Sequence, residues 1–147
     1  MSAYPPEWLC LEIVDRAQDA IILADRDGVI RLWNPGAEAM FGYRAEEALG
    51  HTLDLIIPER LRARHWAGYR ESMATGTTRY AGRVLAVPAV RKDGASISVE
   101  FTIVLLHDPT GTMLGPAAIV RDVTARWEQE RELKKRLSAL EAKTAGD

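Results

Sequence analysis

A histidine lies in the middle of an arginine-rich segment, RLRARHWAGYRES, at residues 60–72. A neutral imidazole is a strong axial ligand for iron when it lies on an apolar wall with room for a flat macrocycle. Four residues recur at intervals of four and would share one face of a helix: Leu61, His65, Tyr69 and Met73. On that face His65 is expected to point inward, either to bind a ligand or, as a core histidine, to hydrogen-bond to the backbone.

Other groups offer less chemistry. His51 follows the Gly50 turn and His107 begins a turn, so surface positions are expected for both. The single cysteine, Cys10, excludes an internal disulfide and a multi-cysteine zinc site. Arginines beside Trp66 and Tyr69 resemble a nucleic-acid surface, but the net charge is −2, so a solvated helix face is expected and nucleic acid is not. The sequence contains no phosphate-binding glycine loop, zinc-protease motif or nucleophile elbow.

The composition indicates one soluble domain. The chain has 147 residues, 47% hydrophobic and 27% charged, and its apolar runs are too short to span a membrane. No basic stretch followed by an apolar region marks a secretion signal, so a cytoplasmic protein without a membrane partner is expected.

The elements that must position His65 can be outlined from periodicity. The pattern of residues 6–19 predicts an amphipathic helix. Residues 20–34 are predicted to form a hairpin that turns at Asp27-Gly28, and residues 35–50 are predicted to form two short helical turns. A longer helix is predicted from Pro58 to Met73, closed by Gly76.

Three strands and a final helix are predicted to follow. The strands cover 79–94, 97–106 and 114–120, and the helix over 122–143 carries an irregular apolar stripe. This order predicts an α+β fold with one curved sheet. We divide it into a flanking helix at 1–19, a central domain at 20–122 and an exit helix at 123–147.

Three segments carry a resemblance to a known family. ADRDGVIRLWNPGAEAMFGYRAEEALG, RKDG and VRDVT resemble the PAS domain, and the match covers about residues 13–124. The resemblance implies a five-stranded antiparallel sheet whose short helices enclose a pocket. PAS pockets are empty or hold flavin, haem or a small metabolite, and the fold alone does not choose among them.

The segment IPERLRARHWAGY is similar to the helix of oxygen-sensor PAS domains that supplies the proximal iron ligand. This likeness implies haem b bound by His65, with Gly68 leaving space for the ring. Five further residues are expected to line the pocket: Leu61, Tyr69, Leu85, Phe101 and Ile103.

The distal side of the pocket is less defined. Oxygen-sensor relatives place an arginine on the next strand, and here an ungapped match gives Leu85 whereas a shift of two residues gives Arg83. Arg83 and Tyr80 are the candidates to contact a bound ligand or substrate, and Arg83 otherwise points to water. Covalent flavin chemistry requires a pocket cysteine in an Asn-Cys-Arg motif, which Cys10 does not supply, so only non-covalent flavin stays open.

Three functions follow from a haem or empty PAS pocket. If these 147 residues act without an output domain, the first function we expect is a stand-alone haem enzyme. It would be similar to N-nitroglycine lyases, which break a nitramine into nitrite, glyoxylate and ammonium. The second is a sensor of a diatomic gas or of redox state, and the third is a cofactor-free dimerisation module. All three are compatible with a homodimer, since the exit helix carries a short leucine stripe.

Overall fold

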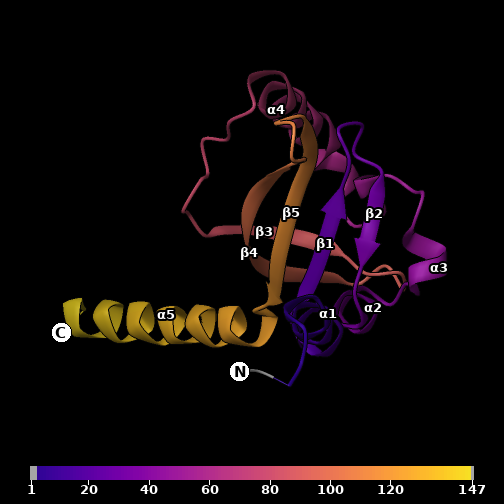
Figure 1. Ribbon diagram of the computed structural model, residues 1–147. Coiled ribbons are helices and arrows are strands. Elements are labelled where there is room, and N and C mark those ends of the chain that lie inside the picture. The colour runs from indigo at the N-terminus through magenta and orange to yellow at the C-terminus, as the bar shows by residue number, and fades with distance from the viewer. Residues whose placement is uncertain (1–2, 147) are drawn as a thin grey trace.

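The structure is a computed structural model that describes residues 3–146, and Figure 1 shows its elements. Met1, Ser2 and Asp147, which end the two predicted flanking segments, lie outside the described residues. The helices are α1 (Pro6–Arg16), α2 (Pro35–Phe41), α3 (Ala45–Ala48), α4 (Arg62–Thr75) and α5 (Thr124–Ala145), with 3-10 turns at Leu53–Leu55 and Glu59–Leu61. The strands are β1 (Ala20–Ala24), β2 (Ile30–Trp33), β3 (Leu85–Val90), β4 (Ser96–His107) and β5 (Met113–Asp122).

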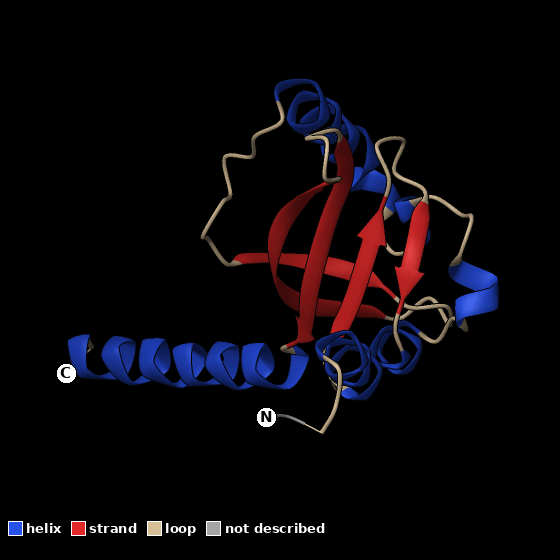
Figure 2. Cartoon of the chain, viewed as in Figure 1, coloured by secondary structure: helices blue, strands red, loops and turns tan. Residues whose placement is uncertain are grey.

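The strands form one five-stranded sheet in the order β2-β1-β5-β4-β3. Every neighbouring pair is antiparallel, and the sheet curves as Figure 2 shows. The period of β4 explains its place, because Ile97 and Val99 are buried while Thr102 and Val104 on the other face are exposed. The predicted α+β fold with a five-stranded antiparallel sheet is confirmed.

The core lies between the sheet and the short helices. Ile22 and Ile30 from the first hairpin are buried together with Trp33 and Phe41, whose ring centroids lie 5.5 Å apart. The indole nitrogen of Trp33 donates to the carbonyl oxygen of Tyr43 at 2.9 Å, so its one polar atom is satisfied.

Asn34 joins three elements where β2 ends and α2 begins. Its Oδ1 accepts from the backbone N–H of Ile21 at 2.8 Å and of Ala37 at 2.9 Å, which caps α2. Its Nδ2 donates to the carbonyl oxygens of Val14 at 2.9 Å and Asp19 at 3.1 Å. Asn34 is 3% exposed, so these four bonds satisfy a buried amide and fix α1 against β1 and α2.

Two predicted boundaries are wrong. The helix predicted from Pro58 begins at Arg62, after a 3-10 turn, although it ends as predicted at Gly76, whose φ is 72°. The strand predicted from residue 79 begins at Leu85, opposite Phe101 of β4. Gly82, with a φ of 73°, turns the chain before that point, so residues 76–84 form a loop outside the sheet (Figure 1).

The two flanking helices lie at the same end of the sheet, and α5 projects away from it (Figure 1). Within residues 3–146, no helix is both long enough and apolar enough to cross a membrane.

Candidate functional site

Helix α4 is held over the β1–β2 turn by two aromatic side chains. The indole nitrogen of Trp66 donates to Oδ1 of Asp54 at 2.7 Å, and the Tyr69 hydroxyl donates to the carbonyl oxygen of Asp25. The Trp66 ring lies directly on Gly28, where a Cβ atom would be only 2.1 Å from it. Gly28 also has a φ of 80°, so both the turn and the seat of α4 require glycine there.

His65 lies beside these two rings on the same helix. Its ring centroid is 4.6 Å from that of Trp66, in an edge-on arrangement, and 5.6 Å from that of Tyr69. The side chain is half-buried, and burial lowers the pKa of His65, against a smaller opposing effect from the Asp54 carboxylate. The imidazole is therefore neutral at pH 7, the form that binds a metal.

The buried Nδ1 atom of His65 has no hydrogen-bond partner. The interpretation of His65 as a core histidine requires a backbone partner, and among residues 3–146 none reaches this ring. A buried polar atom without a partner costs free energy, so such an atom points to a group that binds there.

The surface of α4 is open at Gly68, close to His65. Gly68 lies one helical turn away, and a Cβ atom built on it would meet no atom within 4 Å. Leu61 and Tyr69 on the same face are half-buried, and Met73 is buried. The face predicted from the four-residue spacing is thus the inward face of α4, and the unpaired Nδ1 atom of His65 belongs to it. Within the described residues, no cluster of three or more His, Cys, Asp or Glu side chains could hold a bare metal ion.

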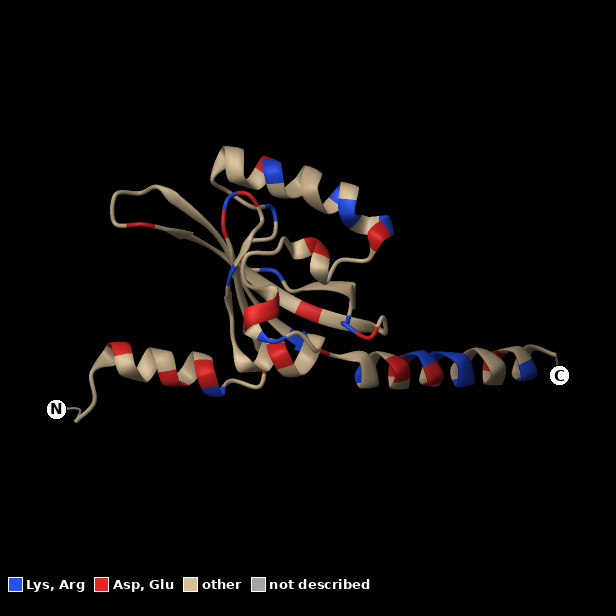
Figure 3. Ribbon diagram, turned by 90° about the vertical axis from the view of Figure 1, so that its right-hand side faces the viewer, with Lys and Arg blue, Asp and Glu red and all other residues tan. Residues whose placement is uncertain are grey.

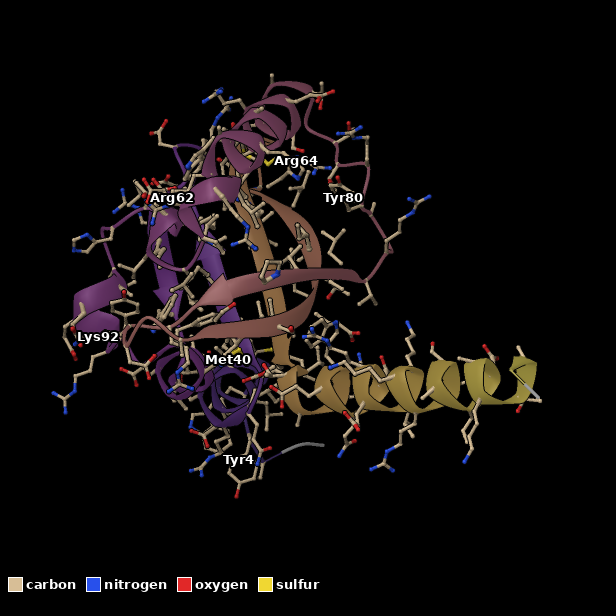
Figure 4. The ribbon with its side chains drawn as sticks, turned by 180° about the vertical axis from the view of Figure 1, so that it is seen from behind. Tyr4, Met40, Arg62, Arg64, Tyr80 and Lys92 are labelled. Carbon is tan, nitrogen blue, oxygen red and sulfur yellow. The ribbon has the colours of Figure 1, made fainter. Side chains whose placement is uncertain are left out.

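The two distal candidates lie on the loop before β3. Of the two positions left open for Arg83, a strand face with Leu85 or a position pointing to water, the structure has the second: Arg83 is exposed and precedes the strand, and its backbone N–H donates to the carbonyl oxygen of Tyr80 at 2.9 Å. Tyr80 is 39% exposed on the loop that leaves α4, with the Arg79 guanidinium 5.9 Å from its ring centroid (Figure 4). Neither side chain contacts His65 in the described structure.

An open hollow of about 570 Å³ lies between this loop and β4. The loop contributes Gly76, Thr77, Thr78, Ala81 and Gly82, and the strand contributes Ile103, Val104 and Leu105. Ile103 lines this hollow, which is not the pocket for which it was predicted, and the pair Leu85 and Phe101 ends the β3–β4 ladder next to it. His65 does not line this hollow.

The sequence reading missed the residues that seat α4. Asp54 and Trp66 are 12 positions apart, and nothing local signals their hydrogen bond. Arg62, one of the arginines expected on a solvated helix face, donates to the carbonyl oxygens of Ile57 at 3.1 Å and Asp54 at 3.2 Å. It therefore anchors the start of α4 to the preceding turn.

Comparisons with known proteins agree with this geometry. A family model described as the PAS fold matches residues 14–128. The chain is 27% identical over 122 residues, 83% of its length, to the oxygen sensor protein DosP of Escherichia coli, of which it spans 15%. It is 29% identical over 144 residues, 96% of its length, to a blue-light photoreceptor of Listeria monocytogenes, of which it spans 55%.

Solved structures show the same fold. The crystal structure of the PAS domain of a protein from Colwellia psychrerythraea superimposes with a TM-score of 0.70 at 22% identity, covering 82% of this chain and 99% of that one. At this identity the likeness supports the fold alone.

Proposed function

Because the chain belongs to the PAS family, we propose that it is a sensor domain that binds haem b through His65. The observation that carries the proposal is the half-buried imidazole on α4 whose buried Nδ1 has no partner. The likeness to an oxygen sensor supports the same choice of cofactor class. Bound haem would supply an iron centre that binds diatomic gases when reduced.

The residues of α4 would divide the work of holding this group. His65 would ligate the iron as a neutral imidazole, and Gly68 would let the ring approach the helix. Trp66 and Tyr69 would keep the helix, and with it the imidazole, in place through Asp54 and the Asp25 carbonyl. Phe101 and Leu85, half-buried partners on β4 and β3, are the residues proposed for the apolar wall on the sheet side, whereas Ile103 lines a hollow that His65 does not line.

The sensor is a better choice than the nitramine lyase. The lyase needs a cation that anchors a substrate carboxylate in the pocket, and Arg83, its candidate, is exposed on a loop. No relative named here is an enzyme acting on a nitro compound. The lyase activity therefore becomes an outcome to be tested. Non-covalent flavin binding is a second outcome to be tested, because one relative is a blue-light photoreceptor.

The test is the absorbance spectrum of protein expressed with a haem supply, before and after reduction by dithionite. We expect a Soret band that shifts on reduction, near-stoichiometric haem in the wild type, and loss of most haem in His65→Ala. His51→Ala replaces an exposed histidine and is the matched control, which should keep its haem. His65→Gly supplemented with imidazole should recover the band, because the free ligand can replace the missing side chain.

Any other result of these measurements would indicate a different function. Full haem content in His65→Ala would refute the ligand assignment. A flavin spectrum would indicate a photoreceptor-like pocket, and a colourless protein after reconstitution would indicate a cofactor-free module. Release of nitrite from N-nitroglycine by the reduced protein would restore the lyase interpretation.

A further inference from the structure

The two edges of β4 are paired over different lengths. Pairing with β5 extends to His107, whereas β3 pairs only with residues 96–101 of β4. Before Leu85, the first residue of β3, the chain forms the loop at 76–84, which Figure 2 shows standing away from the sheet. Residues 102–107 of β4 therefore have an unpaired edge on the β3 side.

The backbone groups on this unpaired edge can be identified from the hydrogen bonds around it. The N–H of Val90 donates to the carbonyl oxygen of Ile56 at 2.9 Å, so the groups of Val90 point away from its β4 partner, Ser96. Pairs with and without hydrogen bonds alternate along antiparallel strands, so the odd-numbered residues of β4 direct their N–H and C=O groups toward β3. Beyond the end of β3 the same alternation applies to Ile103 and Leu105. Their N–H and C=O groups therefore point to the unpaired edge.

These groups face the hollow of about 570 Å³, because Ile103, Val104 and Leu105 form its strand wall. Among residues 3–146, no backbone hydrogen bond joins this part of β4 to the loop at 76–84. Two N–H and two C=O groups of a regular strand thus line a space open to solvent. An additional strand can pair with such an edge.

The loop on the other side of the hollow is held in turns of its own. The N–H of Ala81 donates to the carbonyl oxygen of Thr78 at 3.4 Å, and that of Arg83 donates to Tyr80 at 2.9 Å. Gly82 has a φ of 73°, which is a left-handed and not an extended conformation. The loop therefore forms the opposite wall of the hollow and does not itself pair with β4.

Charge around the hollow indicates what kind of strand fits it. Arg79 and Arg83 are exposed on the loop, and neither forms an ion pair within the described part of the chain. Neither the loop nor residues 102–107 contain an acidic side chain. A second copy of the chain would bring the same cations against each other, whereas an acidic segment would be attracted.

We propose that an extended acidic peptide segment of a partner protein binds in this hollow as an additional strand, hydrogen-bonded to Ile103 and Leu105. Its residues opposite these two lie on the face of the sheet that carries the buried Val99, so they are apolar. The residues between them lie on the other face and carry the acidic side chains, which Arg79 and Arg83 attract.

This interaction is separate from the proposed haem site, because His65 does not line the hollow. Its tests therefore give the same answer for protein with and without haem. The probe is a capped six-residue peptide of alternating valine and glutamate, and the protein is the full chain.

The first experiment is amide hydrogen exchange followed by NMR. Without peptide, the N–H groups of Ile103 and Leu105 should exchange at least about ten-fold faster than those of Thr102 and Val104, which face β5. Saturating peptide should slow the exchange of Ile103 and Leu105 at least about ten-fold. No slowing at millimolar peptide would overturn the proposal.

Two results for the chain alone would also overturn it. Slow exchange of Ile103 and Leu105 at every chain concentration would show that the loop at 76–84 already closes the edge. Exchange that slows as the chain concentration rises would show that a second copy occupies the hollow.

The second experiment uses peptides methylated at backbone nitrogens. Methylation at the valines, whose N–H groups face β4 when their side chains lie on the apolar face, should weaken binding at least about ten-fold. Methylation at the glutamates, whose N–H groups face solvent, is the matched control and should leave the affinity within about two-fold. Equal losses for the two peptides would overturn strand addition.

The third experiment tests charge selection. Arg79→Glu combined with Arg83→Glu should weaken binding of the glutamate peptide about ten-fold and strengthen binding of its lysine counterpart. Lys134→Glu combined with Lys135→Glu makes the same change in net charge on α5, where Figure 3 shows cations and acids intermixed, and should leave the affinity within about two-fold. Equal affinity of the two double variants for the glutamate peptide would refute the choice of an acidic partner.

Discussion

Replacing Gly28 with alanine should dislodge Trp66 from its seat and loosen α4. The variant places a non-glycine residue at a φ of 80°, which costs about 1–2 kcal/mol. Its methyl group would start 2.1 Å from the Trp66 ring, so the ring must move. Moving it stretches the 2.7 Å hydrogen bond to Asp54, for which we estimate a further loss of about 1–2 kcal/mol.

We therefore expect Gly28→Ala to lower the free energy of unfolding by about 2–4 kcal/mol, measured by urea denaturation. Gly94→Ala is the matched control, because Gly94 has a φ of 87° but its Cβ atom would meet nothing within 4 Å. That control should lose only the backbone contribution of about 1–2 kcal/mol. In a Trp66→Ala background the cost of Gly28→Ala should fall to the same value. If Gly28→Ala and Gly94→Ala cost the same in the wild-type background, the packing of Trp66 on the turn does not position α4.

Two further predictions concern side chains that tie elements together. Asn34→Ala should lower the free energy of unfolding by about 3–5 kcal/mol, since four backbone groups, in one buried and three part-buried hydrogen bonds, lose their partner. The exposed Gln18→Ala should change it little, and similar values for both variants would refute the role of Asn34. For Asp25, burial alone would raise the pKa, but hydrogen bonds from Arg31 and from the backbone N–H groups of Val29 and Asp27 together lower it. The stability it contributes is present above the unfolded value of about 3.9 and is lost as pH falls through the folded pKa. Denaturation at several pH values should therefore show wild type more stable than Asp25→Asn near neutrality, with a gap that closes in acid; a constant gap would contradict the assignment.

The parts of the fold that the sequence predicted are those with a local cause. The hairpin at Asp27-Gly28 was predictable because a positive φ there needs glycine, and β4 because burial on one face imposes a period of two. The start of β3 was not predictable, because a strand begins where its backbone pairs with a neighbouring strand. Here the pairing of β3 with β4 begins at Leu85 and Phe101.

The candidate site divides in the same way. Four-residue spacing identified the inward face of α4, and with it His65. Whether Nδ1 finds a partner depends on residues far along the chain, so the unpaired nitrogen could be seen only in the structure. The sequence left two positions open for Arg83, and the one that points to water is observed because β3 does not extend that far.

The entry and exit of the domain are neighbours in one ladder. Ala20, the first residue of β1, pairs with Val120 near the end of β5, and Asp19 binds Arg121 at 3.0 Å beside them. When two antiparallel strands are pulled apart from the same end, their interstrand hydrogen bonds break one after another instead of all at once. A force that separates α1 from α5 would first break the Asp19–Arg121 ion pair and then open the sheet between β1 and β5. The two flanking helices therefore pull on the sheet in the direction in which its hydrogen bonds break one at a time. A low force between α1 and α5 would be enough to separate β1 from β5 at the centre of the sheet.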